Sequence, residues 1–250
     1  MKPIRVLHLM SGFVIEEILG GVTRYVVELL HCLPDEGIRP AVGGLWSYGT
    51  AYEAPRQAEL IRRGIPAVVA APWDEQQAYQ SCLRAWRDFP AAEVGPVEIV
   101  HSHGEFSDLL ALLLRRKLGA RLLVFTIHID IEWAKRPLYG KLFPNLLYPF
   151  CFAAELGVSR QVVENANRRP LSRLLGHRAQ VMHNALNFAR FEGRQVDRPA
   201  KLHALGIPPD ALVVGTVGRL AAQKAVDLLI AAAPLVLARF PQAHFLVVGD

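Results

Sequence analysis

The sequence predicts an α/β protein: a doubly wound, Rossmann-like parallel sheet domain followed by an incomplete second Rossmann-like domain. Two observations carry this prediction. Short β-branched runs alternate with helix-period stretches along almost the whole chain, which is the pattern of a sheet wound with helices. Strand candidates such as residues 121–127 are apolar continuously rather than alternately, as expected of strands that helices cover on both faces.

The composition is that of a globular protein. Hydrophobic residues make up 52% of the 250 residues and charged residues 20%, which excludes a disordered or collagen-like chain. No apolar run approaches the roughly 18 residues that a membrane span needs. The first strand begins almost at Met1, which leaves no room for a signal peptide. The sparse cysteines (Cys32, Cys82 and Cys151) have apolar surroundings and indicate buried, reduced thiols in a cytoplasmic protein.

The expected elements follow one another in strand–helix order. Strands are the runs of aliphatic and β-branched residues, and helices are the stretches in which apolar residues recur every three or four positions. Strands are expected at 4–10, 40–46, 67–71, 97–102, 121–127, 154–158, 179–182, 211–217 and 243–248. Helices are expected at 21–33, 52–63, 75–88, 106–118, 159–168 and 224–239.

A change of composition near residue 190 divides the chain. We expect an N-terminal domain over 1–190 and an interdomain linker over 191–210, because that stretch is polar and contains a Gly/Pro turn. The start of a C-terminal domain follows over 211–250. It offers only two strands and one helix, so we expect it to be incomplete.

Positive charge is concentrated in the middle of the chain. Residues 133–201 carry 12 Lys and Arg against 4 Asp and Glu, whereas residues 1–132 carry 13 against 16. A basic segment of this kind indicates an anionic partner, either phosphate groups or an acidic membrane face, with a solvated basic surface as the alternative. Nucleic acid is not expected, because no stacking-aromatic or helix-in-groove motif accompanies the charge.

The candidate site residues follow strand ends, where ligands of such sheets bind. Gly20 and Gly21 lead into the first helix, so the backbone can approach a ligand closely and the helix N-terminus offers free N–H groups to an anion. The spacing is not that of a dinucleotide-binding loop. A flexible loop before a helix is the alternative.

Two neighbouring strand ends carry imidazoles. His101 and His103 end one strand, and His128 follows the next. We favour His128 as the functional residue, because Thr126 and Asp130 flank it and could fix its tautomer. His101 is expected to pack inside the sheet. The alternative for any one of these histidines is a hydrogen-bonded structural residue.

A third candidate follows the strand at 211–217. Gly218 ends the strand, and Arg219 and Lys224 flank a short loop at a helix N-terminus, so that two cations and free N–H donors can converge on one diphosphate. The alternative is a surface arginine followed by a lysine that opens a solvated helix.

In this order and spacing, these segments resemble the retaining glycosyltransferases of family 4, which have the GT-B fold of two facing Rossmann-like domains. The most specific part is residues 215–220 with Lys224 and residues 226–230, close to the family pattern G-R-L-x-x-x-K-G-x-D-x-L-I. The other matching segments are 20–29, 99–104, 126–128, 157–159 and 181–187.

The resemblance implies transfer of a sugar, with retention, from a nucleotide-diphosphate-sugar to a saccharide, lipid-linked or small-molecule acceptor. It implies that Arg219 and Lys224 bind the donor diphosphate and that His128 lies near the transferred sugar. No metal and no cofactor are expected, because preorganised cations stabilise the departing phosphate. The resemblance further assigns Gly218, Gly20 and Gly21 to the donor phosphates, and His103 and Asp130 to the acceptor side.

The sequence departs from the family pattern in a few places. Ala225 replaces the glycine after the lysine, and Ala185 and Asn187 replace G and D of the interdomain motif. The family's downstream glutamate pair, spaced E-x7-E, has no counterpart before residue 250. We therefore expect this chain alone to be inactive. The alternative is a fragment or degenerate copy that acts as a non-catalytic binding module.

Two further interpretations stay open. The run His101-Ser102-His103, with Ser107-Asp108 behind it, resembles a metal-dependent hydrolase, although the later strand ends lack the further ligands that such a site needs. Residues 137–150 are aromatic, basic and interrupted by proline, so they could contact an anionic membrane peripherally. The alternative for this segment is an inter-strand connection packed on the sheet.

Overall fold

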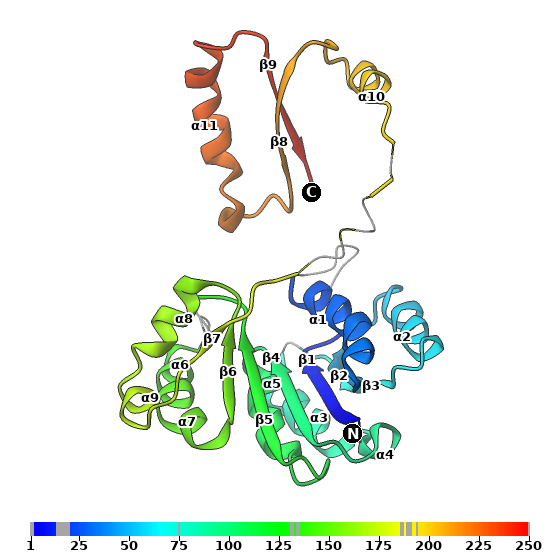
Figure 1. Ribbon diagram of the computed structural model, residues 1–250, viewed down its shortest axis with the longest axis vertical. Coiled ribbons are helices and arrows are strands. Elements are labelled where there is room, and N and C mark those ends of the chain that lie inside the picture. Colours follow the sequence, from blue (N-terminus) through cyan, green and yellow to red (C-terminus); the bar gives the residue numbers. More distant parts are fainter. Residues whose placement is uncertain are drawn as a thin grey trace. The chain divides into compact units, whose positions relative to one another are not determined.

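The computed structural model describes residues 3–13, 21–74, 76–130, 133, 136–185, 188, 192–193 and 195–249. The chain forms two compact units, Met1–Asn187 and Phe188–Asp250, which are described separately below. Both units are built from parallel strands and helices (Figure 1), which confirms the predicted α/β class.

The first unit contains a seven-stranded sheet in the order β3-β2-β1-β4-β5-β6-β7, and all of its neighbouring strands are parallel. The order grows outward from β1 in one direction and from β4 in the other. The sheet is therefore doubly wound, with its switch point between β1 and β4. The strands are β1 Ile4–Met10, β2 Ile38–Ser47, β3 Ala67–Pro72, β4 Ile99–His103, β5 Leu122–Ile127, β6 Ala154–Gly157 and β7 Gln180–Val181.

Helices flank this sheet on both faces (Figure 1). Ser159 caps one of them, α8: its hydroxyl accepts the backbone N–H of Val162 at 3.3 Å. The helical elements of the unit are α1 Gly21–Cys32, η1 Leu33–Glu36, α2 Glu53–Arg62, α3 Ala78–Asp88, α4 Ala91–Val94, α5 Glu105–Leu114, α6 Pro137–Leu142, the π-helical turn η2 Phe143–Leu147, α7 Tyr148–Cys151, α8 Arg160–Asn167 and α9 Pro170–Leu174.

The core lies on both sides of the central strand β1. Leu7 and Leu9 join the apolar cluster that includes residues of α5, whereas Met10 joins the cluster that includes residues of α1. Successive side chains of a strand alternate between faces, so His8 shares the face of Met10 and lies under α1. This placement positions the site described below.

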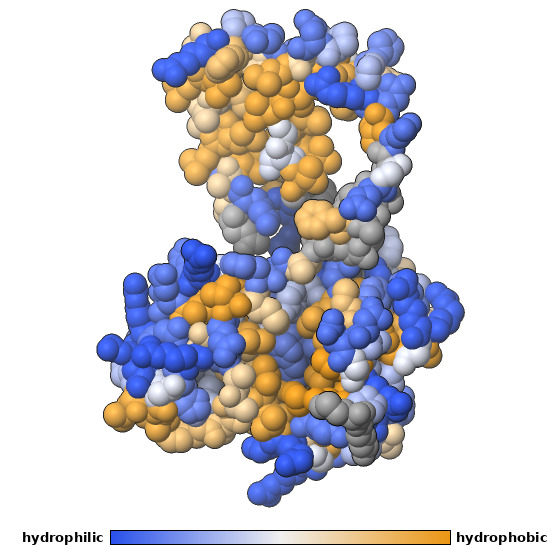
Figure 2. All heavy atoms as spheres, viewed as in Figure 1, coloured by the Kyte–Doolittle hydropathy of each residue, from blue (hydrophilic) through white to orange (hydrophobic). Residues whose placement is uncertain are grey.

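The second unit is small. It pairs β8 Leu212–Val217 with β9 Ala243–Val248 in parallel and adds three helical elements: α10 Arg198–Ala204, the 3-10 turn η4 Ala222–Lys224 and α11 Val226–Leu237. Its buried hydrophobic residues, among those described, are Leu202, Ala211 and Ala243. Much of the surface of this unit is apolar, as the orange spheres over α11 and its two strands show (Figure 2).

Three expectations differ from the structure. The segment expected as a linker over 191–210 contains helix α10, whose cap Asp197 accepts the N–H of Ala200 at 3.0 Å. Residues 137–150, which were not among the expected helices, form the consecutive helical turns α6, η2 and α7. The cysteines are free, as predicted, but none is fully buried: Cys32 is exposed at the end of α1, and Cys82 and Cys151 are half-buried. Within the described part of the chain, no helix is long and apolar enough to cross a membrane.

Candidate functional site

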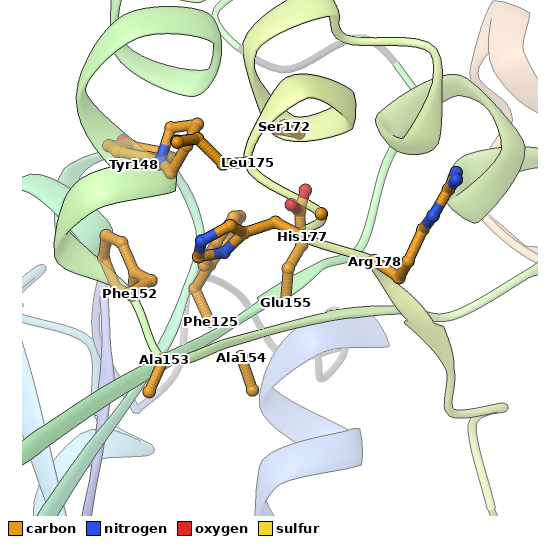
Figure 3. Close-up of a pocket in the computed structure, with 12 residues that line it drawn as sticks. Phe125, Tyr148, Phe152, Ala153, Ala154, Glu155, Ser172, Leu175, His177 and Arg178 are labelled. Atoms are coloured by element: carbon orange, nitrogen blue, oxygen red, sulfur yellow. The ribbon is translucent and has the colours of Figure 1, made fainter.

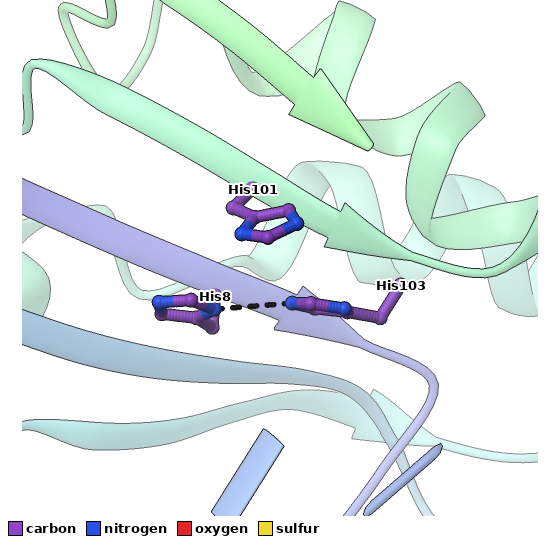
Figure 4. Close-up of side chains that lie close together, drawn as sticks. All are labelled: His8, His101 and His103. Atoms are coloured by element: carbon purple, nitrogen blue, oxygen red, sulfur yellow. Dashed lines mark hydrogen bonds between the residues drawn. The ribbon is translucent and has the colours of Figure 1, made fainter. Parts of the chain in front are cut away.

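Three histidines meet at the switch point of the sheet. Residues two apart on a strand share a face, which brings His101 and His103 of β4 to the same side. The register of the sheet pairs His8 of β1 with His101 and Met10 with His103. Figure 4 shows the resulting cluster, in which Nδ1 of His8 lies 3.0 Å from Nε2 of His103. The rings of His101 and His103 lie 4.2 Å apart, centroid to centroid.

His128, which follows β5, extends this cluster toward the surface. Its Nε2 lies 3.2 Å from Nδ1 of His103, so His103 contacts His8 through one nitrogen and His128 through the other. The ring of Tyr25, from α1, stands edge-on to His103 and to His128, with centroid distances of 5.8 and 5.1 Å. His8 and His103 are buried, whereas His128 is half-buried.

Burial keeps these imidazoles uncharged. Loss of water lowers the pKa of His8 from 6.5 to about 4 and that of His128 to about 4 as well. Burial also holds the pKa values of His101 and His103 well below 6.5, and repulsion from the neighbouring histidines adds to the effect. At neutral pH each ring is therefore neutral, with one N–H donor and one bare nitrogen acceptor.

The expected partners of His128 are wrong. Thr126 instead contacts His101, whose Nε2 lies 2.7 Å from the threonine Oγ1, because both side chains point to the same face of adjacent strands. Asp130 lies beyond the strand end and turns toward α8, where it accepts hydrogen bonds from the side-chain amides of Gln161 (3.0 Å) and Asn165 (2.6 Å). The residue that contacts His128 is His103. The expectation that His101 is buried is confirmed.

Sequence reasoning missed two residues of this cluster, His8 and Tyr25. His8 sits inside a continuous apolar run, where a histidine indicates packing, and Tyr25 lies on the buried face of a helix. The sequence nevertheless contains a signal that could have identified His8. A polar residue in an otherwise apolar strand, two positions before its carboxyl end, points at the crevice in which doubly wound sheets bind ligands.

The described residues contain one histidine group with the spacing of metal ligands. His8, His101 and His103 each offer a ring nitrogen, and these nitrogens lie within 4.8 Å of one another. However, both nitrogens of His103 already contact other imidazoles, and Nε2 of His101 is hydrogen-bonded to Thr126. The cluster is thus internally bonded, with no nitrogen of His103 left over.

The predicted phosphate-binding residues of the second unit lie in one loop. Gly218 ends β8 and donates its N–H to the carbonyl of Val248 at 2.9 Å. Arg219 and Lys224 are both exposed. Lys224 lies in η4 rather than in the long helix, and α11 begins after it with Ala225 as an N-cap that supplies no side-chain hydrogen bond. The loop thus presents two cations beside an uncapped helix N-terminus, which suits an anion.

The glycine pair of the first unit is described only in part. Gly20 lies outside the described residues. Gly21 is the first residue of α1, and a Cβ added to it would meet no atom of the described residues within 4 Å.

Two pockets of the first unit lie at opposite edges of the sheet. The pocket in Figure 3, of about 370 Å³, is lined by Ala153, Ala154 and Glu155 at the amino end of β6. This is the edge of the sheet opposite the carboxyl ends of the strands. A second pocket, of about 250 Å³, is lined by Ile127 and Asp130 at the carboxyl end of β5. In a doubly wound sheet the carboxyl edge binds ligands, so the smaller pocket has the more relevant position.

Comparison with known proteins identifies the family. Residues 19–190 match the model of Glycosyltransferase Family 4, and the chain therefore belongs to this family. It is 29% identical over 247 residues to a D-inositol 3-phosphate glycosyltransferase of Kribbella flavida, an alignment that covers 89% of this chain and 54% of the relative. It is also 31% identical over 159 residues to the phosphatidylinositol N-acetylglucosaminyltransferase gpi3 subunit of Schizosaccharomyces pombe, covering 62% of this chain and 32% of that protein.

Solved structures show the same fold. Anabaena HepE in complex with UDP-glucose has a TM-score of 0.68 at 18% identity, covering 99% of this chain and 61% of HepE. The catalytic domain of starch synthase IV from Arabidopsis thaliana, bound to ADP and acarbose, also has a TM-score of 0.68, at 16% identity, covering 99% of this chain and 68% of that domain. The GT-B-like fold expectation is thereby confirmed. The chain spans about half the length of the first curated relative, 54%.

Proposed function

We propose that the protein transfers a sugar, with retention, from a nucleotide-diphosphate-sugar to an acceptor, and that it needs no metal. The observation that carries the proposal is the loop of Arg219 and Lys224 beside the uncapped N-terminus of α11, in a chain of this family. HepE, which shares the fold, was solved with UDP-glucose, which supports a donor of this class.

The chemistry follows from where charge develops. As the glycosidic bond to the donor phosphate breaks, positive charge builds on the sugar ring and negative charge on the departing diphosphate. Cations held in place beforehand stabilise this charge without reorganisation. We assign this role to Arg219 and Lys224, with the backbone at Gly218 close to the phosphates. From the family resemblance we also propose that the glycine pair Gly20 and Gly21 of the first unit binds donor phosphate.

The test is substitution of each cation in the complete protein. We expect Arg219→Ala and Lys224→Ala each to lower kcat/KM roughly 10²-fold, the magnitude typical of losing one transition-state donor. Arg239→Ala is the matched control, because this exposed arginine lies beyond the far end of α11. Wild-type turnover in both site variants would refute the assignment.

On the acceptor side we propose His128 as the residue that contacts the reacting sugar, with His103 in contact with it and Asp130, which turns toward α8, at the same edge of the sheet. His128 is half-buried at the carboxyl edge of the sheet, where a ligand can reach it. We expect His128→Ala to lower kcat more than donor affinity. A variant that loses only nucleotide affinity, with kcat intact, would contradict this role.

The alternative is a binding module without catalysis, and this 250-residue chain by itself is expected to be inactive. The second unit buries few of its described residues, so it supports the phosphate loop poorly. Assaying the chain and the complete protein side by side with a panel of nucleotide-sugars separates the possibilities. Turnover by the complete protein alone supports the enzyme, and turnover by neither supports the binding module.

We further propose a peripheral contact with an anionic membrane through helices α6 to α7. Leu138, Leu142, Leu146 and Phe150 recur every fourth residue and are 70%, 48%, 57% and 67% exposed. An exposed apolar row within a basic segment is typical of surfaces that insert shallowly among acidic lipids. Leu142→Glu should abolish co-sedimentation with phosphatidylglycerol vesicles, whereas Leu83→Glu, at a leucine of α3 that is 61% exposed, should not.

A further inference from the structure

The histidines at the switch point form a continuous hydrogen-bonded row. Nδ1 of His8 lies 3.0 Å from Nε2 of His103, and Nδ1 of His103 lies 3.2 Å from Nε2 of His128. The row runs from a residue that is 1% exposed to one that is half-buried at the sheet edge. It therefore connects the interior of the sheet to the residue that the proposed function places against the ligand.

Because each ring is neutral, the row must be polarised in one direction. A neutral imidazole donates from one nitrogen and accepts at the other, so His103 can donate to one neighbour only and must accept from the other. In the outward direction His8 donates to His103 and His103 donates to His128. In the inward direction both hydrogen bonds reverse, and His128 is the first donor.

The inner end of the row decides between the two directions. Nε2 of His8 is fully buried and has no partner among the described residues. The inward direction would place the proton of His8 on this nitrogen, as a buried N–H donor without an acceptor, which folded proteins rarely leave. In the outward direction Nε2 of His8 carries no proton. The proton is on Nδ1, which donates it in the hydrogen bond to His103. The outward direction is therefore favoured.

We propose that His103, backed by His8, is a positioning residue that holds His128 as the tautomer protonated on Nδ1. His128 then accepts the hydrogen bond of His103 at Nε2 and keeps one N–H for a ligand. It meets an oxygen of the sugar or acceptor as a hydrogen-bond donor, not as a base. That last role rests on the proposed function, whereas the tautomer does not.

The ring of Tyr25 packs against two of these imidazoles and restricts their orientation. Its ring stands edge-on to His103 and to His128, at interplanar angles of 62° and 70°, and so limits the rotation of both imidazoles. A fixed ring orientation is needed for one nitrogen of His128 to stay with His103 while the other stays available.

The tautomer can be observed directly by NMR. In ¹⁵N-labelled protein at pH 7.5, long-range ¹H–¹⁵N correlations of the imidazole rings distinguish a protonated from a bare ring nitrogen. We expect His128 with a protonated Nδ1 and a bare Nε2, assigned by loss of its signals in His128→Gln. A wild-type His128 protonated on Nε2 would overturn the proposal whatever the variants show. Stoichiometric zinc in the purified protein would also overturn it, because a metal would displace the shared protons.

A matched pair of variants tests the part of His103. His103→Leu removes the donor, so we expect His128 to revert to the Nε2-protonated form that predominates in free histidine. His103→Asn carries an amide donor near the position of Nδ1 and should retain the wild-type tautomer. An unchanged tautomer in His103→Leu would refute the role of His103.

Activity separates this inference from the proposed function. In the complete protein, we expect kcat to fall about tenfold in His103→Leu and to recover most of the way in His103→Asn, with the KM for the donor unchanged in both. If the tautomer behaves as described but His128→Ala is fully active, the proposed role of His128 fails and the positioning by His103 stands.

Discussion

Gly12, just past the carboxyl end of β1, is required by close packing. A Cβ at this position would lie 2.6 Å from the carbonyl oxygen of Trp46 and 2.7 Å from the Tyr48 ring. The backbone of β2 cannot retreat easily, because Trp46 donates its N–H to the carbonyl of Ser11 at 2.8 Å. We expect Gly12→Ala to lower the free energy of unfolding by about 1–3 kcal/mol.

The control for this variant is Gly44→Ala. Gly44 lies on β2 beside Gly12, but a Cβ there would meet its nearest atoms at 3.4 Å, an ordinary contact. We expect its effect to stay within about 1 kcal/mol, measured by urea denaturation of both proteins. Equal losses in the two variants would show that the crowding at Gly12 is relieved at little cost.

The buried histidines predict how stability depends on pH. The pKa of His8 is lowered by burial from 6.5 to about 4, so the unfolded chain binds a proton that the folded chain does not. Its contribution is complete above pH 6.5 and is lost as the pH falls toward 4. For His8 alone this is on the order of 3 kcal/mol, from 1.36 kcal/mol per pKa unit.

The measurement is the free energy of unfolding at several pH values between 7.5 and 4 in the wild type and in His8→Asn. Asparagine keeps a polar side chain but does not titrate in this range, so the variant should lose less stability on acidification. Parallel curves for the two proteins would mean that His8 does not carry the dependence.

How far the sequence predicts this site depends on the residue. The strand-end positions of His103 and His128 follow from the alternation of strands and helices, and the two do lie together. The partner of His128 could not be predicted, because adjacency in sequence suggested Thr126, whereas pairing across strands decided the contact. His8 required the strand order, which places β1 beside β4.

Helix α11 begins at a strained residue. Ala225, its N-cap, has φ 50° and ψ 40°, the left-handed region that glycine adopts freely and that costs other residues about 1–2 kcal/mol. The sequence pattern of the family has glycine at this position. We expect Ala225→Gly to be stabilising by about 0.5–1 kcal/mol, after the extra chain entropy of glycine is subtracted.

Ala238→Gly is the matched comparison at the other end of α11. Ala238 has φ −62°, a right-handed conformation in which glycine is less favourable than alanine. Thermal melts should therefore shift upward for Ala225→Gly and downward for Ala238→Gly. A downward shift in both would argue against strain at Ala225.

The longer elements were the more predictable ones. Strand β1 has the expected bounds, and α1 differs from expectation by one residue at its end, because each carries a sustained apolar pattern. The short helix α10 was expected to be linker. Among its seven residues only Leu202 is buried, and only the cap Asp197 with a proline two residues later indicates a helix start. Seven residues make about two turns of helix, which are too few for the periodicity to stand out.

The two units differ in how much they bury, and this decides their relative stability. In the first unit, residues of every strand from β1 to β5 are fully or almost fully buried, for example Leu7, Leu45 and Val100 at 0% exposure. In the second unit, α11 contains no buried residue, and Leu228, Ile230 and Leu235 are 67%, 64% and 74% exposed. Burial of apolar surface is the main favourable term in folding, so the second unit gains much less of it.

Limited proteolysis of the 250-residue chain should therefore proceed in a fixed order. Local opening is easiest where few apolar groups are buried, so trypsin is expected to cleave first at basic residues of the second unit, such as Lys201, Lys224 and Arg239. A fragment ending near Arg190 should persist, because the sheet from β3 to β7 is complete without the residues that follow.

Mass spectrometry of the digest over time identifies the cleavage sites and their order. The first unit offers an internal control, since exposed arginines such as Arg62 and Arg116 are equally good trypsin sites by sequence but belong to the unit with the larger buried core. Early cleavage at those arginines, with the second unit intact, would show that stability does not follow burial in this chain.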